Sequence, residues 1–143
     1  MANLDCTSYL QALKAQVSEL GISNRVQFLG QRSDISHLLA AADIYCQPNT
    51  SPEPFGIAFI EALYTGLPVV TTAIGGALEI VNESCGFLVA PNDINALSEV
   101  LNLLISTPSK RSTLAFTGVE RARQLCEPAR QLPKLQNLLF QLV

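Results

Sequence analysis

Apolar residues recur at two spacings along the chain and divide it into alternating helices and strands. A stripe at helical spacing runs through Leu10, Leu13 and Val17 and predicts a helix over about 4–20. Short apolar and β-branched runs predict strands at 26–29, 43–46, 67–72 and 86–89. Helical spacing between these runs predicts helices at 33–42, 56–64, 92–106 and 109–125, with a short helix after the glycines at 75–76.

This alternation is typical of an α/β fold, and it predicts a Rossmann-like parallel sheet with helices on both faces. Such folds normally open on a strand, whereas this chain opens on a helix, so we expect the first strand or strands to be missing. Ligands of these sheets bind beyond the carboxyl ends of the strands. The loops expected there, at 30–34, 47–56 and 72–76, are rich in glycine, proline and short polar residues.

The end of the chain is more apolar than a terminal helix usually is. Pro128 and Pro133 bracket a segment whose last turns, from Leu135 to Val143, are rich in leucine. Packing of these turns against a surface outside the chain is one interpretation, and an ordinary exposed terminal helix is the other.

Composition is that of a single folded domain and argues against several functions. The chain has 143 residues, of which 48% are hydrophobic and 15% charged, so it can bury a core without crosslinks. A net charge of −3 and the lack of a basic run argue against nucleic-acid binding. The four cysteines contain no C-x-x-C pair and there is one histidine, so we expect free thiols in a reducing cytoplasm and no metal site. From the sequence pattern we expect neither a secretory signal nor a membrane span.

The segment 51–61 carries most of the chemistry. Glu53 and Glu61 lie on either side of a predicted helix N-terminus, in apolar surroundings. Pro52 and Pro54 restrict the loop before that helix because proline locks its own φ angle. The helix is apolar on nearly every face, so we expect it to be buried. A buried carboxylate without a partner is costly, so Glu61 should face a cleft or a hydrogen-bond donor.

Backbone amides between the two glutamates supply a predicted anion site. The amides around Phe55, Gly56 and Ile57 open the helix and have no partner within it. Gly75 and Gly76 would let the backbone approach a ligand closely, although a double glycine more often only makes a turn. Neither G-x-G-x-x-G nor G-x-x-x-x-G-K-[ST] occurs, which argues against ordinary dinucleotide and P-loop sites.

An anion site between two carboxylates suits a ligand with an anionic centre and hydroxyl groups at both ends, because carboxylates accept hydrogen bonds from hydroxyls. A nucleotide-diphosphate sugar has this layout. Spacing alone leaves a second interpretation open, in which Glu53 is a surface loop residue and Glu61 an exposed helix residue.

The segment EPFGIAFIE, from Glu53 to Glu61, resembles the E-x7-E motif of retaining glycosyltransferases with the GT-B fold. This large group, the group 1 glycosyltransferases, includes sucrose and glycogen synthases. Segments on both sides resemble the same group, namely VQFLG at 26–30, AADI at 41–44, GLPVV at 66–70 and GGALE at 75–79. The resemblance covers about 21–106, the core of the group's C-terminal, donor-binding domain, and the closing helices at 107–143 match by position.

The resemblance implies a role for each matching residue. Glu53 would be the catalytic residue and hold the hydroxyls of the donor sugar, and Glu61 would bind the ribose hydroxyls. The other donor-binding residues implied are Phe55, Gly56 and Ile57 beside sugar and phosphate, Arg32 and Asp34 beside the base, and Gly75 and Gly76 on the far side of the pocket.

The resemblance also implies parts that are not found here. In the family, an arginine and a lysine early in the donor domain neutralise the departing diphosphate, and nothing in residues 1–20 matches them. The N-terminal acceptor domain is not present either. We therefore expect a fragment of a two-domain enzyme with weak or no transfer activity of its own, because stabilising the leaving group is often the largest catalytic contribution.

The expected substrate is a nucleotide-diphosphate sugar, with no cofactor and no metal. The expected location is cytoplasmic, and a position at the membrane surface through the full-length enzyme stays open. Two alternatives remain: a non-catalytic nucleotide-sugar-binding or interaction module, and another GT-B enzyme such as a sugar-nucleotide epimerase or a phosphorylase.

Overall fold

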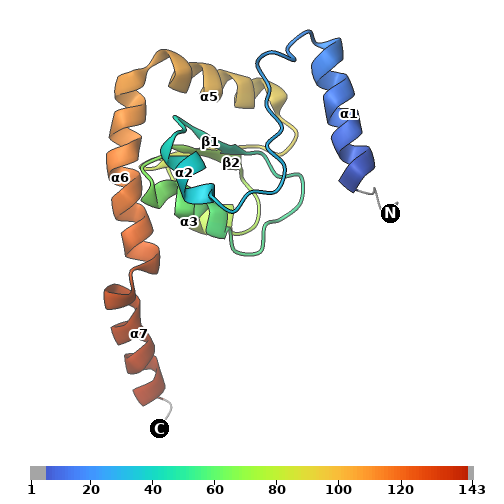
Figure 1. The fold of residues 1–143 in the computed structure, drawn as a ribbon. Coiled ribbons are helices and arrows are strands. Elements are labelled where there is room, and N and C mark those ends of the chain that lie inside the picture. The colour runs from blue at the N-terminus through green and yellow to red at the C-terminus, as the bar shows by residue number, and fades with distance from the viewer. Residues whose placement is uncertain (1–5, 142–143) are drawn as a thin grey trace. The chain divides into compact units, whose positions relative to one another are not determined.

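The computed structural model describes residues 6–141 (Figure 1). Its helices are α1 (Cys6–Glu19), α2 (Ile35–Ala40), α3 (Ile57–Tyr64), α4 (Ala77–Ile80), α5 (Ile94–Ser106), α6 (Pro108–Cys126) and α7 (Pro128–Phe140). Its strands are β1 (Tyr45–Gln47), β2 (Val69–Thr72) and β3 (Gly86–Val89). Contacts within the chain form two compact units, Met1–Ser33 and Asp34–Val143.

The first unit contains α1 followed by an irregular segment. The predicted strand at 26–29 is wrong, because these residues have no regular secondary structure. A strand is held by hydrogen bonds to a neighbouring strand, and within residues 6–141 no strand pairs with this segment. Val26, Phe28 and Leu29 are 36%, 38% and 45% exposed. The run of apolar residues therefore has a local preference for a strand, but no neighbouring strand in the described chain stabilises it.

The second unit is built on a parallel sheet with the strand order β1-β2-β3, which confirms the predicted α/β class. Tyr45 lies opposite Val69, and Val69 lies opposite Gly86. Every residue of β2 is buried, as expected for the central strand of a sheet that is covered on both faces. The β-branched sequence VVTT is suited to this position because branched side chains pack well on a pleated surface.

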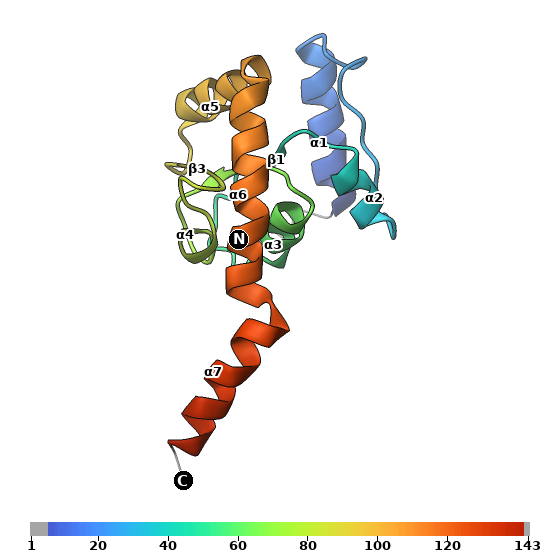
Figure 2. The same ribbon diagram turned by 90° about the vertical axis from the view of Figure 1, so that its left-hand side faces the viewer.

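Helices cover both faces of the sheet, with α3 and α4 on one side and α5 on the other (Figure 2). Phe59 of α3 belongs to the apolar cluster on the first face, whereas Val70 and Leu104 belong to the cluster on the second. The long helix α6 contributes Ala122 to the first cluster and Leu114 to the second. It therefore joins the two layers.

The predicted helices at 92–106 and 109–125 are present as α5 and α6, with small shifts at their ends. Asp93 caps α5, because its Oδ1 accepts a hydrogen bond from Ala96 N at 2.9 Å. Arg111 closes the other end, because its Nη1 donates to Leu104 O at 2.6 Å. Pro108 opens α6, where its missing amide costs nothing.

The last helix, α7, is longer than the bracketing prolines suggested, because Pro133 lies inside it. Its apolar side chains are exposed, with Leu132, Leu135 and Leu139 at 59%, 53% and 55%. Packing against a surface outside the chain stays a prediction. Among residues 6–141, no helix combines the length and the apolar character needed to span a bilayer.

We predict that Gly86→Ala destabilises the second unit. A Cβ at Gly86 would lie 1.9 Å from Val69 O, the backbone of the paired strand. The free energy of unfolding should fall by about 2 kcal/mol or more, measured by urea denaturation with circular dichroism. Gly118→Ala is the control and should cost less, because its Cβ would meet a side-chain methyl carbon of Leu63 at 3.1 Å and not a backbone atom at 1.9 Å. Equal losses in both variants would contradict the β2–β3 register.

Candidate functional site

Two loops at the carboxyl edge of the sheet contact each other through backbone atoms. Gly76 N donates a hydrogen bond to Glu53 O at 2.8 Å. A Cβ at Gly75 would lie 2.5 Å from Glu53 O, and one at Gly76 would lie 2.4 Å from Phe55 O. Only glycine permits this approach, so the double glycine does more than make a turn: it holds the backbone of the Glu53 loop in place.

The N-terminus of α3 begins immediately after that loop. Gly56 is buried and has a φ angle of 91°, which other residues adopt only with strain. The first helical hydrogen bond runs from Phe59 N to Gly56 O at 3.0 Å. The amides of Ile57 and Ala58 precede it and are available to a ligand, and no side chain of the described residues caps this end. The geometry is that of an anion site.

The prediction that α3 is buried on nearly every face is wrong. Phe59 and Leu63 are fully buried, but Ile57 and Tyr64 are 63% and 43% exposed, and Glu61 on the same face is exposed as well. The helix belongs to an outer layer and therefore packs through one side only. Part of its outer side, at Glu61 and Tyr64, borders a cavity.

A cavity of about 310 Å³ lies between α2 and α3. Ile35, Ser36 and Leu39 line it from α2, and Glu61, Tyr64 and Thr65 line it from α3 and its end. Glu61 thus borders a cavity, although its side chain is exposed and not buried as the sequence had suggested. The cavity combines mostly apolar walls with one carboxylate, which is the usual make-up of a small-molecule site.

Tyr45 is a residue of this region that sequence reasoning missed. Its ring contacts Phe59 edge to face, with 6.3 Å between the centroids and an interplanar angle of 78°. Burial raises the pKa of the Tyr45 hydroxyl, and the carboxylates of Glu61 and Glu53 raise it further. Both predicted glutamates are therefore close enough for their charge to act on one hydroxyl. A tyrosine at the start of a strand gave no sign of this in the sequence.

The residues predicted to border the base lie in different units. Asp34 precedes α2 in the second unit, where its carbonyl oxygen accepts from His37 N at 3.1 Å and from Leu38 N at 3.2 Å. Arg32 belongs to the first unit. For both residues, contact with a base stays a prediction.

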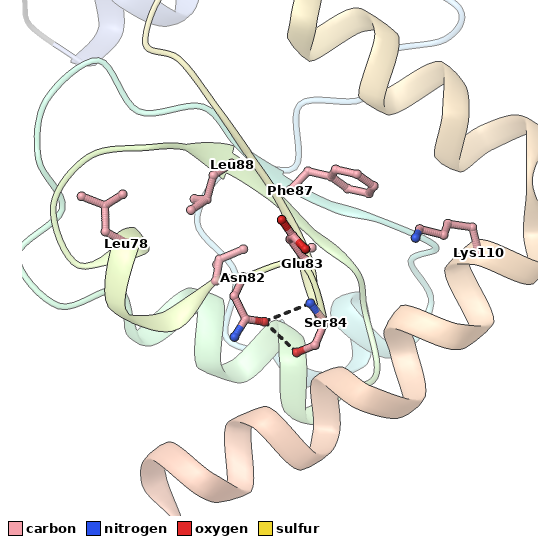
Figure 3. Close-up of a pocket in the computed structure, with 9 residues that line it drawn as sticks. Leu78, Asn82, Glu83, Ser84, Phe87, Leu88 and Lys110 are labelled. Carbon is pink, nitrogen blue, oxygen red and sulfur yellow. Dashed lines mark hydrogen bonds between the residues drawn. The ribbon is translucent and has the colours of Figure 1, made fainter.

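A larger, open cavity of about 920 Å³ lies beside β3, between the end of α4 and the start of α6 (Figure 3). None of the predicted site residues lines it. Its polar groups are largely engaged within the chain: Ser84 donates to Asn82 Oδ1 from both its amide and its hydroxyl, and Lys110 Nζ lies 5.9 Å from the centroid of the Phe87 ring. We see no chemistry there that matches the predicted site.

Comparison with known proteins gives a family match across most of the chain. The family model of the group 1 glycosyl transferases matches residues 7–121. The lipopolysaccharide glucosyltransferase WaaG of Escherichia coli is 36% identical over 116 residues, covering 80% of this chain and 30% of WaaG. The D-inositol 3-phosphate glycosyltransferase of Corynebacterium urealyticum is 34% identical over 137 residues, covering 87% of this chain and 32% of that protein.

Solved structures are also similar to this chain over most of its length. HepE of Anabaena in complex with UDP has a TM-score of 0.87 and 35% sequence identity, covering 94% of this chain and 37% of the HepE chain. The complex of HepE with UDP-glucose has a TM-score of 0.85 at the same identity. This chain spans about a third of the length of the relatives that it matches.

We predict that Glu61→Gln lowers the pKa of Tyr45, because it removes a negative charge that disfavours the phenolate. Glu53→Gln should lower it by a smaller amount, since Glu61 has the larger effect of the two. Absorbance at 295 nm follows the titration, and subtraction of the Tyr45→Phe profile isolates this tyrosine. Glu99→Gln, an exposed change on α5, should leave the titration unchanged. The same profile in all three glutamine variants would show that neither site glutamate lies near Tyr45.

Proposed function

Because this chain belongs to the group 1 glycosyltransferase family, we propose that it is the donor-binding part of a retaining glycosyltransferase with the GT-B fold. Its substrate is a nucleotide-diphosphate sugar. The observation that carries this proposal is the likeness to HepE, which shares 35% of its residues over 95% of this chain and whose structure holds UDP-glucose. The spacing of Glu53 and Glu61 in the E-x7-E pattern supports retention.

In this proposal the nucleoside occupies the cavity between α2 and α3. Glu61 accepts hydrogen bonds from the ribose hydroxyls, because a carboxylate offers several acceptor positions to paired hydroxyls. Ile35 and Leu39 contact the apolar faces of the nucleoside. The exposed position of Glu61 at the rim of this cavity supports the assignment, since the carboxylate needs no costly burial before the ligand arrives.

The diphosphate lies at the N-terminus of α3. The amides of Ile57 and Ala58 donate to its oxygens, and the positive end of the helix dipole favours the negative charge. When the bond between the anomeric carbon and the diphosphate breaks, the electron pair goes to the diphosphate oxygen. Donors that are already oriented toward that oxygen stabilise the charge without reorganisation.

Glu53 holds the hydroxyls of the transferred sugar next to this site. Pro52 and Pro54 restrict the conformations of its loop, and the hydrogen bond from Gly76 N to Glu53 O holds the loop in place. A loop held in this way needs little ordering when the sugar binds, which preserves binding energy for the reaction. The named relatives are transferases, which favours transfer over epimerisation or binding without turnover.

We predict that the two glutamates have separable effects on ligand binding. Calorimetry with a panel of nucleoside diphosphates and their sugars, including UDP and UDP-glucose, provides the measurement. Glu61→Ala should weaken binding of both members of the matching pair by about tenfold or more, the usual loss when a hydrogen bond to a charged group is removed. Glu53→Ala should weaken binding of the nucleotide sugar and leave binding of the nucleoside diphosphate unchanged. Glu99→Ala, at an exposed position outside the site, is the control and should leave binding unchanged. If binding of every ligand is unchanged in both site variants as well, the assignment is refuted.

A further inference from the structure

The Glu53 loop joins β1 to α3 and is anchored at two points. Its start is held by the sheet, because Thr72 Oγ1 donates a hydrogen bond to Asn49 O at 2.7 Å. Its middle is held by the turn that opens α4, through the bond from Gly76 N to Glu53 O at 2.8 Å. A Cβ at Gly75 would lie 2.8 Å from Glu53 N, so this turn packs directly on the loop. The position of Glu53 therefore depends on the position of α4.

Helix α4 needs support from outside itself. It has four residues, and a helix of this length is not stable alone. Val81 follows it in an extended conformation, so no further helical amide can donate to the carbonyl groups of Glu79 and Ile80. The side chains of Ala77 and Ile80 are buried in the core. Their burial holds one side of α4 but leaves these two carbonyl groups without a helical partner.

One side chain of α6, which runs beside α4 (Figure 2), bonds to both carbonyl groups. Arg121 Nε donates to Ile80 O at 3.0 Å, and Arg121 Nη2 donates to Glu79 O. Two bonds from one planar guanidinium fix the direction of the helix end as well as its place. The positive charge also lies at the C-terminal end of α4, where the helix dipole is negative. Arg121 is partly buried, which reduces competition from water for these bonds.

We propose that Arg121 is a positioning residue for Glu53, which it holds in place for the donor sugar by fixing α4. This inference rests on the proposed function of Glu53. Arg121 touches no substrate and takes no part in bond formation. Binding of the nucleoside diphosphate depends on it less, because the cavity beside Glu61 is lined by α2 and α3. The amides at the start of α3 belong to a helix that its own buried residues, Phe59 and Leu63 among them, hold in the core.

A second arginine of α6 provides a matched control. Arg111 Nη1 donates to Leu104 O at 2.6 Å and to Ile105 O at 3.1 Å, so it supports the end of α5 as Arg121 supports the end of α4. Both arginines are partly buried. Leu104 belongs to the apolar cluster on the other face of the sheet from α3 and α4. Loss of Arg111 should therefore weaken the fold without moving the Glu53 loop.

The first measurement is amide hydrogen exchange of Gly76 in the isotope-labelled chain without ligand, followed by nuclear magnetic resonance. Its rate is expressed relative to the amide of Val70 in the buried strand β2, which corrects for a change in overall stability. Arg121→Gln should raise the relative rate about threefold or more, because the Gly76 bond to Glu53 loosens with α4. Arg111→Gln should leave the relative rate unchanged. Arg121→Lys keeps the charge and one donor, so its rate should be intermediate.

The second measurement is calorimetry with matching pairs of nucleoside diphosphate and nucleotide sugar, beginning with UDP and UDP-glucose. Arg121→Gln should weaken binding of the nucleotide sugar about threefold or more and weaken binding of the nucleoside diphosphate less. In the Glu53→Ala background the sugar contact is already absent, so Arg121→Gln should add no loss specific to the sugar. Arg111→Gln should change binding of neither ligand.

An unchanged relative exchange rate of Gly76 in Arg121→Gln would overturn the inference. Equal weakening of both ligands of a pair, or a sugar-specific loss that persists with Glu53→Ala, would also overturn it. If Arg121→Gln does not fold, Arg121→Lys and Arg111→Lys are compared by the same two measurements. If no pair binds the wild-type chain, the proposed function is refuted, and hydrogen exchange still decides whether Arg121 holds the Glu53 loop.

Discussion

The close backbone contact between the glycine pair and the Glu53 loop is the constraint on which the candidate site depends. The prolines at 52 and 54 limit the shapes of the loop, but they do not determine where it lies. That position comes from the hydrogen bond of Gly76 N with Glu53 O. Gly76 in turn precedes α4, whose last carbonyl oxygen, on Ile80, accepts from Arg121 Nε of α6 at 3.0 Å. A cation far along the chain thus supports the helix that supports the loop.

The strands contribute to the same edge through their side chains as well as their ladder. Thr71 and Thr72 end the β-branched run of β2, and both are buried. Their hydroxyls donate to Gln47 O at 2.8 Å and to Asn49 O at 2.7 Å, so they satisfy the carbonyl groups where β1 stops and the loop begins. The branched carbon atoms of threonine pack well in the sheet, and its hydroxyl supplies a hydrogen bond to a backbone carbonyl group at the end of the sheet. This explains why the apolar run changes from valine to threonine at that point.

Most of the second unit could be predicted from the sequence because its signals are local. The strand at 86–89 has the predicted bounds, and α5 begins after the predicted cap at Asp93. The errors have a common origin, since periodicity describes a segment and not its neighbours. The segment 26–29 has the composition of a strand without a partner strand in the described chain. Helix α3 has the composition of a buried helix, yet one of its faces borders a cavity.

The candidate site could be predicted only in part, for a related reason. Glu53 and Glu61 are conspicuous because carboxylates are rare in apolar surroundings. Tyr45 and Asn49 are not, because single polar residues in or beside a strand are common. Their connection appears when every second residue from 45 to 49 is considered together, since Tyr45, Gln47 and Asn49 can then form one line of hydrogen bonds. Alternation of polar side chains across the end of a strand is the signal that would have found them.

Exposed apolar residues have two different meanings in this chain. On α7, Leu132, Leu135 and Leu139 are exposed at successive helical spacings and form a continuous stripe, the pattern of a helix face that packs on protein. At the carboxyl edge, Ile94 is exposed singly beside a cavity that is also lined by the carboxylate of Asp93. An apolar wall with a few placed polar groups is the pattern of a small-molecule site. The arrangement of neighbouring polar groups, more than exposure itself, therefore distinguishes a surface for a ligand from a surface for a protein.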